Sequence, residues 1–334
     1  MSKTILIISN SQDLHADLVA ARLTAGGHPL FRLDLDHFPR DFQTCQWHAG
    51  GALHNKIRRR GDEPWLDLAE VGAVWIRKPG EFTFLSDELA PQELAYARQE
   101  AEHALFSLLY TLDCYWVSHP LALRGAQWKG EQLKRAARMG FLVPDSLTTN
   151  APDEVLAFKH GLAGDMIFKS LSDPMLAGGE LEPEQRSNGG LGTTIVDDDM
   201  LRNVEAVGQL HCHFQRYIPK QYELRVTVIG ERVFAAKIHS QDDARTAVDS
   251  RDMSAPICYE AAQLPDELRR RCVAFVRSYD LHSGALDLIV TPGGEVVFLE
   301  NNPAGQFLYI EQLIPEFRMI DAMADTLVEG ALCH

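Results

Sequence analysis

Two runs of strand-forming residues flank a Gly-Gly pair in GALDLIVTPGGEVVFLENNPAGQF, residues 284–307. A two-residue turn at 293–294 would make these runs a β-hairpin and would place Asp287 directly opposite Glu300. Asn302 lies two residues after Glu300, so its side chain points to the same face of the strand. The pattern therefore predicts that two carboxylates and one amide gather on one side of a hairpin.

These oxygen donors indicate a cation site. Two carboxylates a few ångströms apart repel each other, so they need a cation or a shared proton between them. Hard oxygen ligands without His or Cys suit Mg²⁺, which takes few protein carboxylates and completes its shell with water and phosphate oxygens. The alternative is an exposed hairpin face with incidental acids, and spacing alone leaves both interpretations open.

The composition is that of a folded globular protein. The chain has 334 residues, enough for two or three domains, with 46% hydrophobic and 24% charged residues. Its formal net charge of −15 argues against a nucleic-acid surface, because phosphate binding needs a basic footprint. The only basic run, Lys56 with the three arginines 58–60, is interpreted as a solvated hairpin tip.

The sequence predicts a cytoplasmic protein. Its first apolar run is too short for a signal-peptide core, and its longest apolar tract falls short of a membrane span. The six cysteines form no C-x-x-C pair, so we expect free thiols and no membrane partner.

The chain reads as α/β first and α+β afterwards. KTILIISN at 3–10 predicts a strand, 11–27 has helical apolar spacing, and HPLFRLDLD at 28–36 predicts a second strand. This β-α-β opening implies a parallel sheet with a right-handed crossover. ELRVTVIG-ERVFAAKI at 223–238 predicts a hairpin in the later part. We place the expected domains at 1–118, 119–214 and 215–334.

Other signals along the chain are weak one by one. Lys169 lies within the apolar strand DMIFKSL and must reach solvent or meet an anion. The loop 176–192 is rich in glycine, which lets main-chain N–H groups approach phosphates, although an ordinary flexible connection explains it as well. Lys129 fits a solvated helix face, and Arg225 could simply pair with Glu223 on its own strand.

The order of these features resembles that of the ATP-grasp ligases. The features are Lys129, Lys169, the glycine loop, QRYIP at 215–219, the hairpin at 223–238, Asp287 and ENN at 300–302. The resemblance runs from about residue 118 to 330, and the α/β domain matches the one that usually precedes this fold. VWIRKP at 74–79 and FLENNPAGQF at 298–307 look most like the maturases of microviridin-type peptides, the graspetide synthetases.

The resemblance implies a role for each matching residue. Two lysines would hold the α- and β-phosphates of ATP, four hinge residues would read adenine through their main chain, and an acid would contact the ribose. This nucleotide-binding set is Lys129, Lys169, Gln215, Arg216, Tyr217, Ile218 and Glu223. Arg216 stands where relatives often have an acid, so only its main chain is assigned. Arg225 matches the catalytic arginine beside the γ-phosphate, and the Mg²⁺ ligands match Asp287, Glu300 and Asn302.

The implied activity is ADP-forming ligation on a ribosomal precursor peptide. A substrate carboxylate would attack ATP, and a hydroxyl or amine would capture the acyl phosphate, which closes an ester or amide macrocycle. The partner is then a precursor with leader and core segments, and a homodimer is compatible with the sequence. Asp249 and Arg251, in the polar stretch 240–256, are assigned to substrate contact, with an ordinary solvated loop as the alternative.

Two rival functions stay open at this point. One is an ATP-grasp ligase that acts on a small amino acid or peptide, or that adds amino acids to a protein. The other is a nucleotide-binding regulatory protein without turnover, which retention of Asp287, Glu300 and Asn302 disfavours.

Overall fold

The N-terminal part is a four-stranded parallel sheet with a helix on each face. The computed structural model describes residues 3–61, 63–172, 192–251 and 254–333. The strand order is β2-β1-β6-β7, with every neighbouring pair parallel, which confirms the expected β-α-β opening. The elements are β1 (Thr4–Ser9), α1 (Leu14–Ala25), β2 (Leu30–Asp34), β6 (Val71–Ile76), α2 (Pro91–Leu109) and β7 (Tyr115–Val117).

Alternation along β1 explains the two helical layers. Ile5 and Ile7 pack in one buried cluster with residues of α1, whereas Leu6 and Ile8 pack in another with residues of α2. Successive side chains of a strand point to opposite faces, so a continuous apolar run fits a sheet that is covered on both sides.

A small antiparallel sheet extends from this part and corrects the prediction for the basic run. Its strands are β3 (Phe42–Ala49), β4 (Ala52–Arg59) and β5 (Leu66–Asp67). The basic run is not a hairpin tip, because residues 56–59 lie inside β4 and the turn falls at 50–51. The Lys56 ammonium group and the Arg58 guanidinium group lie over the Trp65 ring at 4.5 and 4.4 Å, so the apolar stems and charges cover an aromatic side chain.

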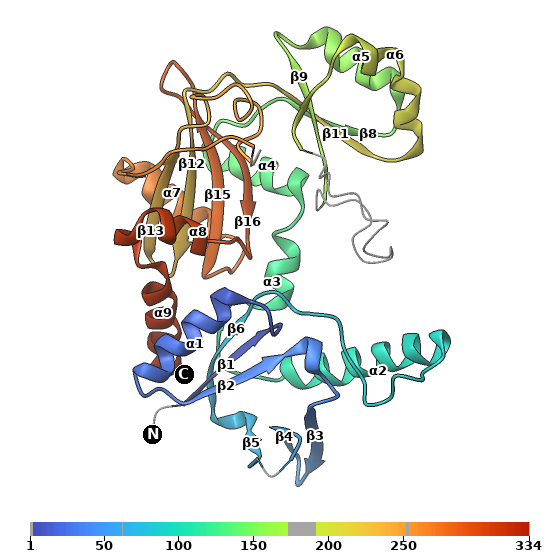
Figure 1. Cartoon of the computed structure of the whole chain (residues 1–334), viewed down its shortest axis with the longest axis vertical. Helices are drawn as coiled ribbons and strands as arrows, with labels where there is room; N and C mark the ends of the chain where they lie inside the picture. Colours follow the sequence, from blue (N-terminus) through green and yellow to red (C-terminus); the bar gives the residue numbers. More distant parts are fainter. Residues whose placement is uncertain (1–2, 62, 173–191, 252–253, 334) are drawn as a thin grey trace.

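The middle of the chain forms a second, antiparallel sheet in the order β10-β9-β11-β8. Its small core joins Val155, Met166, Val204 and Phe214, and this part lies at the upper right of Figure 1. The elements are β8 (Ser146–Thr149), α5 (Pro152–Gly161), β9 (Met166–Lys169), β10 (Thr194–Ile195), α6 (Asp198–Arg202) and β11 (Cys212–Arg216).

The third part is a five-stranded antiparallel sheet in the order β14-β13-β12-β15-β16. Helices α4 and α7 contribute Leu133, Ala136, Cys272 and Phe275 to the core on one of its faces. The predicted hairpin turns at residues 230–231, as expected. The strands are β12 (Tyr222–Ile229), β13 (Arg232–Ile238), β14 (Tyr259–Ala262), β15 (Ser283–Val290) and β16 (Val296–Asn302). The helices are α3 (Pro120–Gly125), α4 (Lys129–Arg138), α7 (Asp266–Arg277), α8 (Leu308–Leu313) and α9 (Met319–Cys333).

The last helix ties the end of the chain to its beginning. Figure 1 shows α9 running down from the third part to lie beside α1, with both termini at the same end of the molecule. Met319, Met323 and Leu327 of α9 share one buried cluster with Ile5 and Trp75 of the N-terminal sheet. The α/β part and the α+β part are therefore packed on each other, and the expected order of fold types is confirmed.

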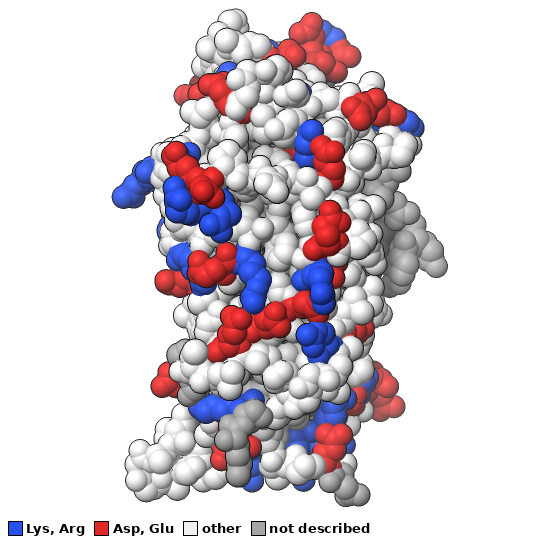
Figure 2. Space-filling model, turned by 90° about the vertical axis from the view of Figure 1, so that its left-hand side faces the viewer, with Lys and Arg blue, Asp and Glu red and all other residues white. Residues whose placement is uncertain are grey.

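The surface carries mixed charge. On the face in Figure 2, Lys and Arg side chains are interspersed with Asp and Glu. Of the helices that the structure describes, none combines the length and the apolar character needed to cross a bilayer.

Candidate functional site

The β15–β16 hairpin reaches the predicted pairing by a different route. The turn has three residues rather than two, because Thr291 pairs with Glu295 across residues 292–294. Leu288 consequently faces Phe298, one residue out of the predicted register. A β-bulge between Leu288 and Asp287 then restores the register, and Asp287 lies opposite Glu300. The predicted turn length is wrong, but the predicted opposition of the two acids is confirmed.

Each acid of the hairpin is held by a cation from another element. Arg225 on β12 donates through Nη1 to both carboxylate oxygens of Asp287, at 2.7 and 2.8 Å. Asn302 Nδ2 donates to the same carboxylate at 3.0 Å. Lys129 Nζ lies 2.5 Å from Glu300 Oε2. Two acids, one amide and two cations therefore converge on one face of the sheet.

The two carboxylates have opposite pKa shifts. Burial raises the pKa of Asp287, and the nearby charge of Glu300 adds to that effect while Arg225 opposes it. Burial also acts to raise the pKa of Glu300, but Lys129 and Lys169 outweigh it and lower that pKa. Paired acids with diverging pKa values are typical of functional sites.

The predicted phosphate lysines belong to two different elements, a helix and a strand. Lys129 is the first residue of α4, where a cation is unfavourable because the helix dipole is positive at that end. Lys169 is the last residue of β9, and burial lowers the pKa of its ammonium group. Glu300 acts on Lys169 electrostatically, but no acid among the described residues forms an ion pair with it. An ammonium group in that position calls for an anion.

Some of the main-chain N–H groups of the predicted hinge, residues 215–218, are already hydrogen-bonded within the protein. Gln215 and Arg216 end β11, and the Arg216 and Tyr217 N–H groups donate to the carbonyl oxygens of Asp145 and Asp165 at 2.9 and 2.8 Å. The Ile218 N–H makes no main-chain hydrogen bond within the described residues. Adenine recognition at this hinge would therefore depend on the Ile218 N–H and on carbonyl groups.

The predicted ribose acid lies in a polar cluster on β12. Glu223 accepts from Lys220 Nζ at 2.6 Å and from Ser250 Oγ at 2.9 Å. It does not pair with Arg225, which binds Asp287 instead. The simple Glu223–Arg225 salt bridge considered from the sequence is therefore not formed.

The predicted substrate residues contact each other and the end of the glycine-rich loop. The Arg251 guanidinium group donates to Asp249 at 2.6 and 2.8 Å, and Asp249 Oδ2 accepts from the Thr193 N–H at 2.7 Å. The charge of Arg251 also acts on the pKa values of Lys169 and Glu300, which it lowers. Most of the 176–192 loop lies outside the described residues.

Three residues of the site were not predicted. His213 on β11 is 2% exposed, and burial together with Lys129 and Lys169 lowers its pKa to about 4. Gln132 of α4 accepts from the Asn301 N–H at 2.7 Å and donates to the Asn301 carbonyl at 2.9 Å, which fixes β16 between its two ligand candidates. The third residue is Lys220, which forms an ion pair with Glu223, the predicted ribose acid. Alternation along β11 could have revealed His213, since it shares a strand face with Gln215.

The donor set fits Mg²⁺. Asp287, Glu300 and Asn302 offer hard oxygens, and because Asn302 donates to Asp287 through Nδ2, its Oδ1 is left for a cation. Within the described residues, no cluster of three or more His, Cys, Asp or Glu side chains suited to a metal is found. Because the three candidate donors are all oxygens, a softer metal that prefers nitrogen or sulfur is a poorer match than Mg²⁺.

Comparison with known proteins finds matches to the N-terminal part and to the whole chain. A family model described as the MvdD pre-ATP grasp domain matches residues 4–124. The RiPP-associated ATP-grasp ligase of Chryseobacterium gregarium, solved with ADP and a leader and core peptide, is 27% identical with a TM-score of 0.86, covering 98% of this chain and 97% of its own. No curated protein sequence matches the chain significantly.

Two macrocyclases of Microcystis aeruginosa MRC are similar over their whole length. MdnC, solved with the precursor peptide MdnA, is 29% identical with a TM-score of 0.83, and covers 98% of this chain and 99% of its own. MdnB is 28% identical with a TM-score of 0.78, covering 98% of this chain and 100% of its own.

The fold and the comparisons define an ATP-grasp ligase that follows a pre-ATP-grasp domain, as the sequence predicted. Within that class the chain is similar to ligases of ribosomal-peptide maturation, and the expected resemblance to microviridin-type graspetide synthetases is confirmed.

Proposed function

We propose that this chain uses ATP and Mg²⁺ to close ester or amide macrocycles between side chains of a ribosomal precursor peptide. The observation that carries the proposal is the convergence of Lys129, Arg225 and the oxygen donors of Asp287, Glu300 and Asn302 on one sheet face. Whole-length likeness to ligases solved with leader, core or precursor peptides supports the substrate class.

The side chains would divide the work by charge. Lys129 and Lys169 supply positive charge for the phosphates, Glu223 accepts hydrogen bonds from the ribose, and residues 215–218 border the adenine. Arg225 orients Asp287 and would stabilise negative charge at the reacting phosphoryl and acyl groups. Mg²⁺ held by Asp287, Glu300 and Asn302 would neutralise charge on the phosphate oxygens.

The chemistry needs little side-chain proton transfer. A substrate carboxylate oxygen forms a bond to the γ-phosphorus, and the bond between that phosphorus and ADP breaks. A hydroxyl or amine then attacks the acyl phosphate, loses its proton and releases inorganic phosphate. The peptide therefore loses the elements of one water for each ester or amide formed.

The proposal extends to substrate contact and assembly. Asp249 and Arg251 would contact the core peptide, because Asp249 binds the end of the glycine-rich loop and the charge of Arg251 acts on Glu300. We also propose a cytoplasmic location, which the six free cysteines support, and a homodimer as the assembly.

Division of the chain into domains at 118 and 214 stays a prediction. Helix α4 packs with the third sheet and helix α9 packs with the first sheet, so contacts cross both proposed boundaries.

The decisive experiment measures ADP release and peptide mass together. The purified protein is incubated with Mg²⁺ and ATP, and with either a precursor peptide encoded beside its gene or a panel of free amino acids and dipeptides. We expect ADP release with the precursor and a peptide mass lower by one water for each ring.

The alternatives give different results in the same experiment. ADP release with free amino acids alone would assign the chain to the small-molecule ligases. Nucleotide binding without ADP release from any carboxylate substrate would indicate a regulatory protein and would overturn the proposal.

A further inference from the structure

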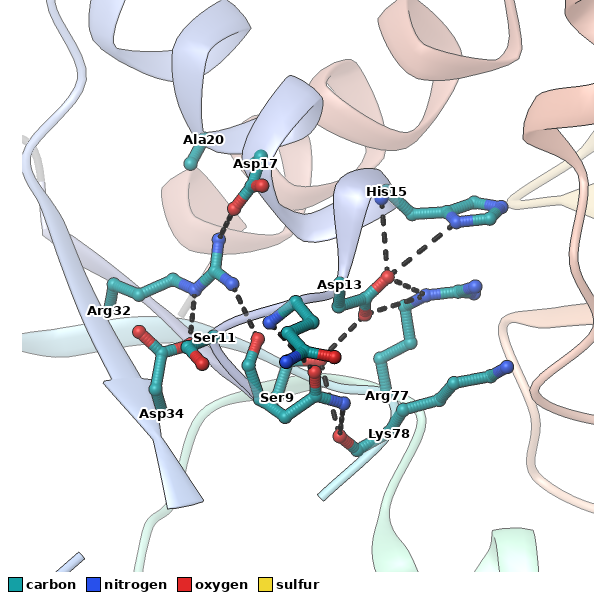
Figure 3. Close-up of polar contacts among 12 residues, drawn as sticks. Ser9, Ser11, Asp13, His15, Asp17, Ala20, Arg32, Asp34, Arg77 and Lys78 are labelled. Atoms are coloured by element: carbon teal, nitrogen blue, oxygen red, sulfur yellow. Dashed lines mark hydrogen bonds and ion pairs between the residues drawn. The ribbon is translucent and has the colours of Figure 1, made fainter. Parts of the chain in front are cut away.

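A buried ionic network lies at the start of α1, outside the site described above (Figure 3). Asp13 caps this helix and accepts from Ser9 Oγ at 2.6 Å and from Arg77 Nε at 2.9 Å. The Asp13 and Arg77 side chains are each only 3% exposed. His15 lies on the other side of Asp13, with its Nδ1 3.6 Å from Oδ1 of the carboxylate.

The network turns its remaining polar groups towards the segment that follows the Mg²⁺ ligand candidates. His15 Nε2 accepts hydrogen bonds from the N–H groups of Phe307 and Leu308, at 3.1 and 3.0 Å. Because Nε2 accepts, the proton of the neutral imidazole must lie on Nδ1, facing Asp13. Arg77 Nη1 donates to the Gly305 carbonyl at 3.4 Å. The N-terminal domain thus holds this segment through main-chain groups of three residues, Gly305, Phe307 and Leu308.

The same segment is held from the opposite side by the metal platform, which is the set of proposed Mg²⁺ ligands Asp287, Glu300 and Asn302 together with Arg225. Arg225 Nη2 donates to the Gln306 carbonyl at 3.4 Å, while its Nη1 binds Asp287. The Gly305 N–H donates to the Asn302 carbonyl at 3.1 Å and closes a turn directly after that ligand candidate. One short loop therefore connects the N-terminal network with both Asp287 and Asn302.

Gly305 shows how closely the loop is fitted. A Cβ at this position would lie 2.6 Å from Ala285 Cβ and 3.2 Å from Arg225 Nη2. Phe307 is 2% exposed, its ring meets His15 edge-on at 4.8 Å, and the Arg77 guanidinium group lies 5.8 Å from its centre. The loop cannot shift on one side without disturbing groups on the other.

From this geometry we propose that Asp13, His15 and Arg77 are positioning residues for the metal platform. They fix the main chain of residues 305–308, and through that loop they hold Arg225 against Asp287 and place Asn302. The N-terminal domain is then a working part of the ligase site. This inference rests on the proposed role of Asp287, Glu300 and Asn302 as Mg²⁺ ligands.

The experiment compares two substitutions of His15 with a matched control. In His15→Leu the two N–H groups of the loop lose their acceptor, whereas in His15→Gln the amide oxygen reaches the position of Nε2 and can accept in its place. Arg32→Gln is the control, since Arg32 forms ion pairs with Asp17 and Asp34 at the same corner of the domain, and none of its hydrogen bonds or ion pairs within the described residues reaches the loop.

Two measurements are made on each purified variant. The first is Mg²⁺ titration of the ADP-saturated protein by calorimetry, and the second is amide hydrogen exchange of residues 305–308 without ligand. In His15→Leu we expect faster exchange and an Mg²⁺ dissociation constant raised about tenfold, the lower end for losing an orienting partner of a metal ligand. His15→Gln should stay within about twofold of the wild type.

The control separates positioning from general destabilisation. We expect Arg32→Gln to lower the melting temperature without altering Mg²⁺ affinity or exchange at 305–308. Unchanged Mg²⁺ affinity in His15→Leu, or an equal loss in Arg32→Gln, would overturn the positioning role. Absence of Mg²⁺-dependent ADP binding in the wild type would instead overturn the proposed function itself.

Discussion

The molecule contains two networks of acidic and basic side chains that differ in burial. We call the buried network of Asp13, His15 and Arg77 the closed network, and the partly exposed one around Asp287 and Glu300 the open network. In the junction between the domains, Asp13 and Arg77 are each 3% exposed at the side chain. On the hairpin, Asp287 is 28% exposed, Glu300 is 30% exposed, and Lys169 has no acid partner among the described residues. The first network pairs its charges in a buried position, whereas the second leaves its acids partly exposed and the Lys169 ammonium group without an ion pair among the described residues.

The pKa shifts show the same difference. Burial alone would raise the pKa of Asp13, but hydrogen bonds from His15, Ser9 and Arg77 outweigh burial and hold that pKa well below its usual value. On the hairpin, burial and Glu300 raise the pKa of Asp287 in spite of Arg225. The closed network stabilises its ionised acid by itself, whereas on the hairpin the ion pair with Arg225 does not outweigh the effects of burial and of Glu300 on Asp287.

The largest effect is expected where the open network loses a metal ligand. Glu300→Gln keeps the shape of the side chain but removes the charge that the proposed Mg²⁺ would need. We expect ATP-dependent ligation to fall about 10³-fold, measured as ADP release with saturating precursor.

The same hairpin supplies the control for this substitution. Glu295 lies at the exposed turn, so Glu295→Gln should keep the activity within about twofold of the wild type, as most surface substitutions do. Full ligation by Glu300→Gln would rule out the metal assignment.

The open network could be partly read from the sequence because alternation is local information. Side-chain period two placed Glu300 and Asn302 on one face, and the order of motifs added Lys129 and Lys169. The predicted turn length is wrong by one residue. The β-bulge at Leu299, which has no partner on β15, compensates for this difference. A bulge depends on tertiary packing, which a local sequence pattern does not contain. The sequence therefore predicts the correct pair of acids, Asp287 and Glu300, although it predicts the wrong turn length.

The closed network could not be predicted from the sequence. Asp13 and His15 are separated from Phe307 by almost the whole chain, and they meet only because α9 packs the C-terminal end on the first sheet. Asp13 reads locally as an ordinary N-cap, which is its structural role as well. Nothing in the residues around His15 signals that its Nε2 accepts from a distant loop.

The second prediction concerns the lysine that has no acid partner. Lys169→Met removes a desolvated charge, so we expect a higher melting temperature in the absence of nucleotide together with an ADP affinity lowered about 10²-fold. Scanning calorimetry and titration calorimetry measure the two effects. Lys134→Met on the exposed side of α4 is the control and should alter neither. A melting temperature that falls with unchanged ADP affinity would show that Lys169 is structural.

The third prediction breaks the connection between the networks. Gly305→Ala would drive a methyl group into Ala285 and Arg225, so Asp287 should lose its orientation. We expect Mg²⁺ affinity of the ADP complex to fall about tenfold in titration calorimetry. Gly293→Ala is the matched control, because its Cβ would meet only Thr291 Oγ1, at 3.7 Å. Equal behaviour of the two variants would separate the loop from the platform.

The smallest effect is a pH dependence carried by His213 in the open network. Burial, Lys129 and Lys169 lower its pKa from 6.5 to about 4, while Glu300 opposes them. Between these two values the unfolded chain binds a proton that the folded chain does not, so His213 makes stability fall as the pH decreases through this window. Above the upper value both states are neutral and the contribution is absent.

The melting temperature is measured from neutral pH down to a pH of about 4.5. This range includes the pH at which the imidazole of His213 gains its proton in the unfolded chain. Phosphates beside Lys129 and Lys169 would offset the charges that hold the proton off His213, so ADP should raise its pKa, visible in the imidazole NMR shifts. A His213→Gln variant should show a shallower decline. If ADP leaves the His213 pKa unchanged while it binds, the nucleotide phosphates do not lie beside these lysines, and the open network would have to bind its anion elsewhere.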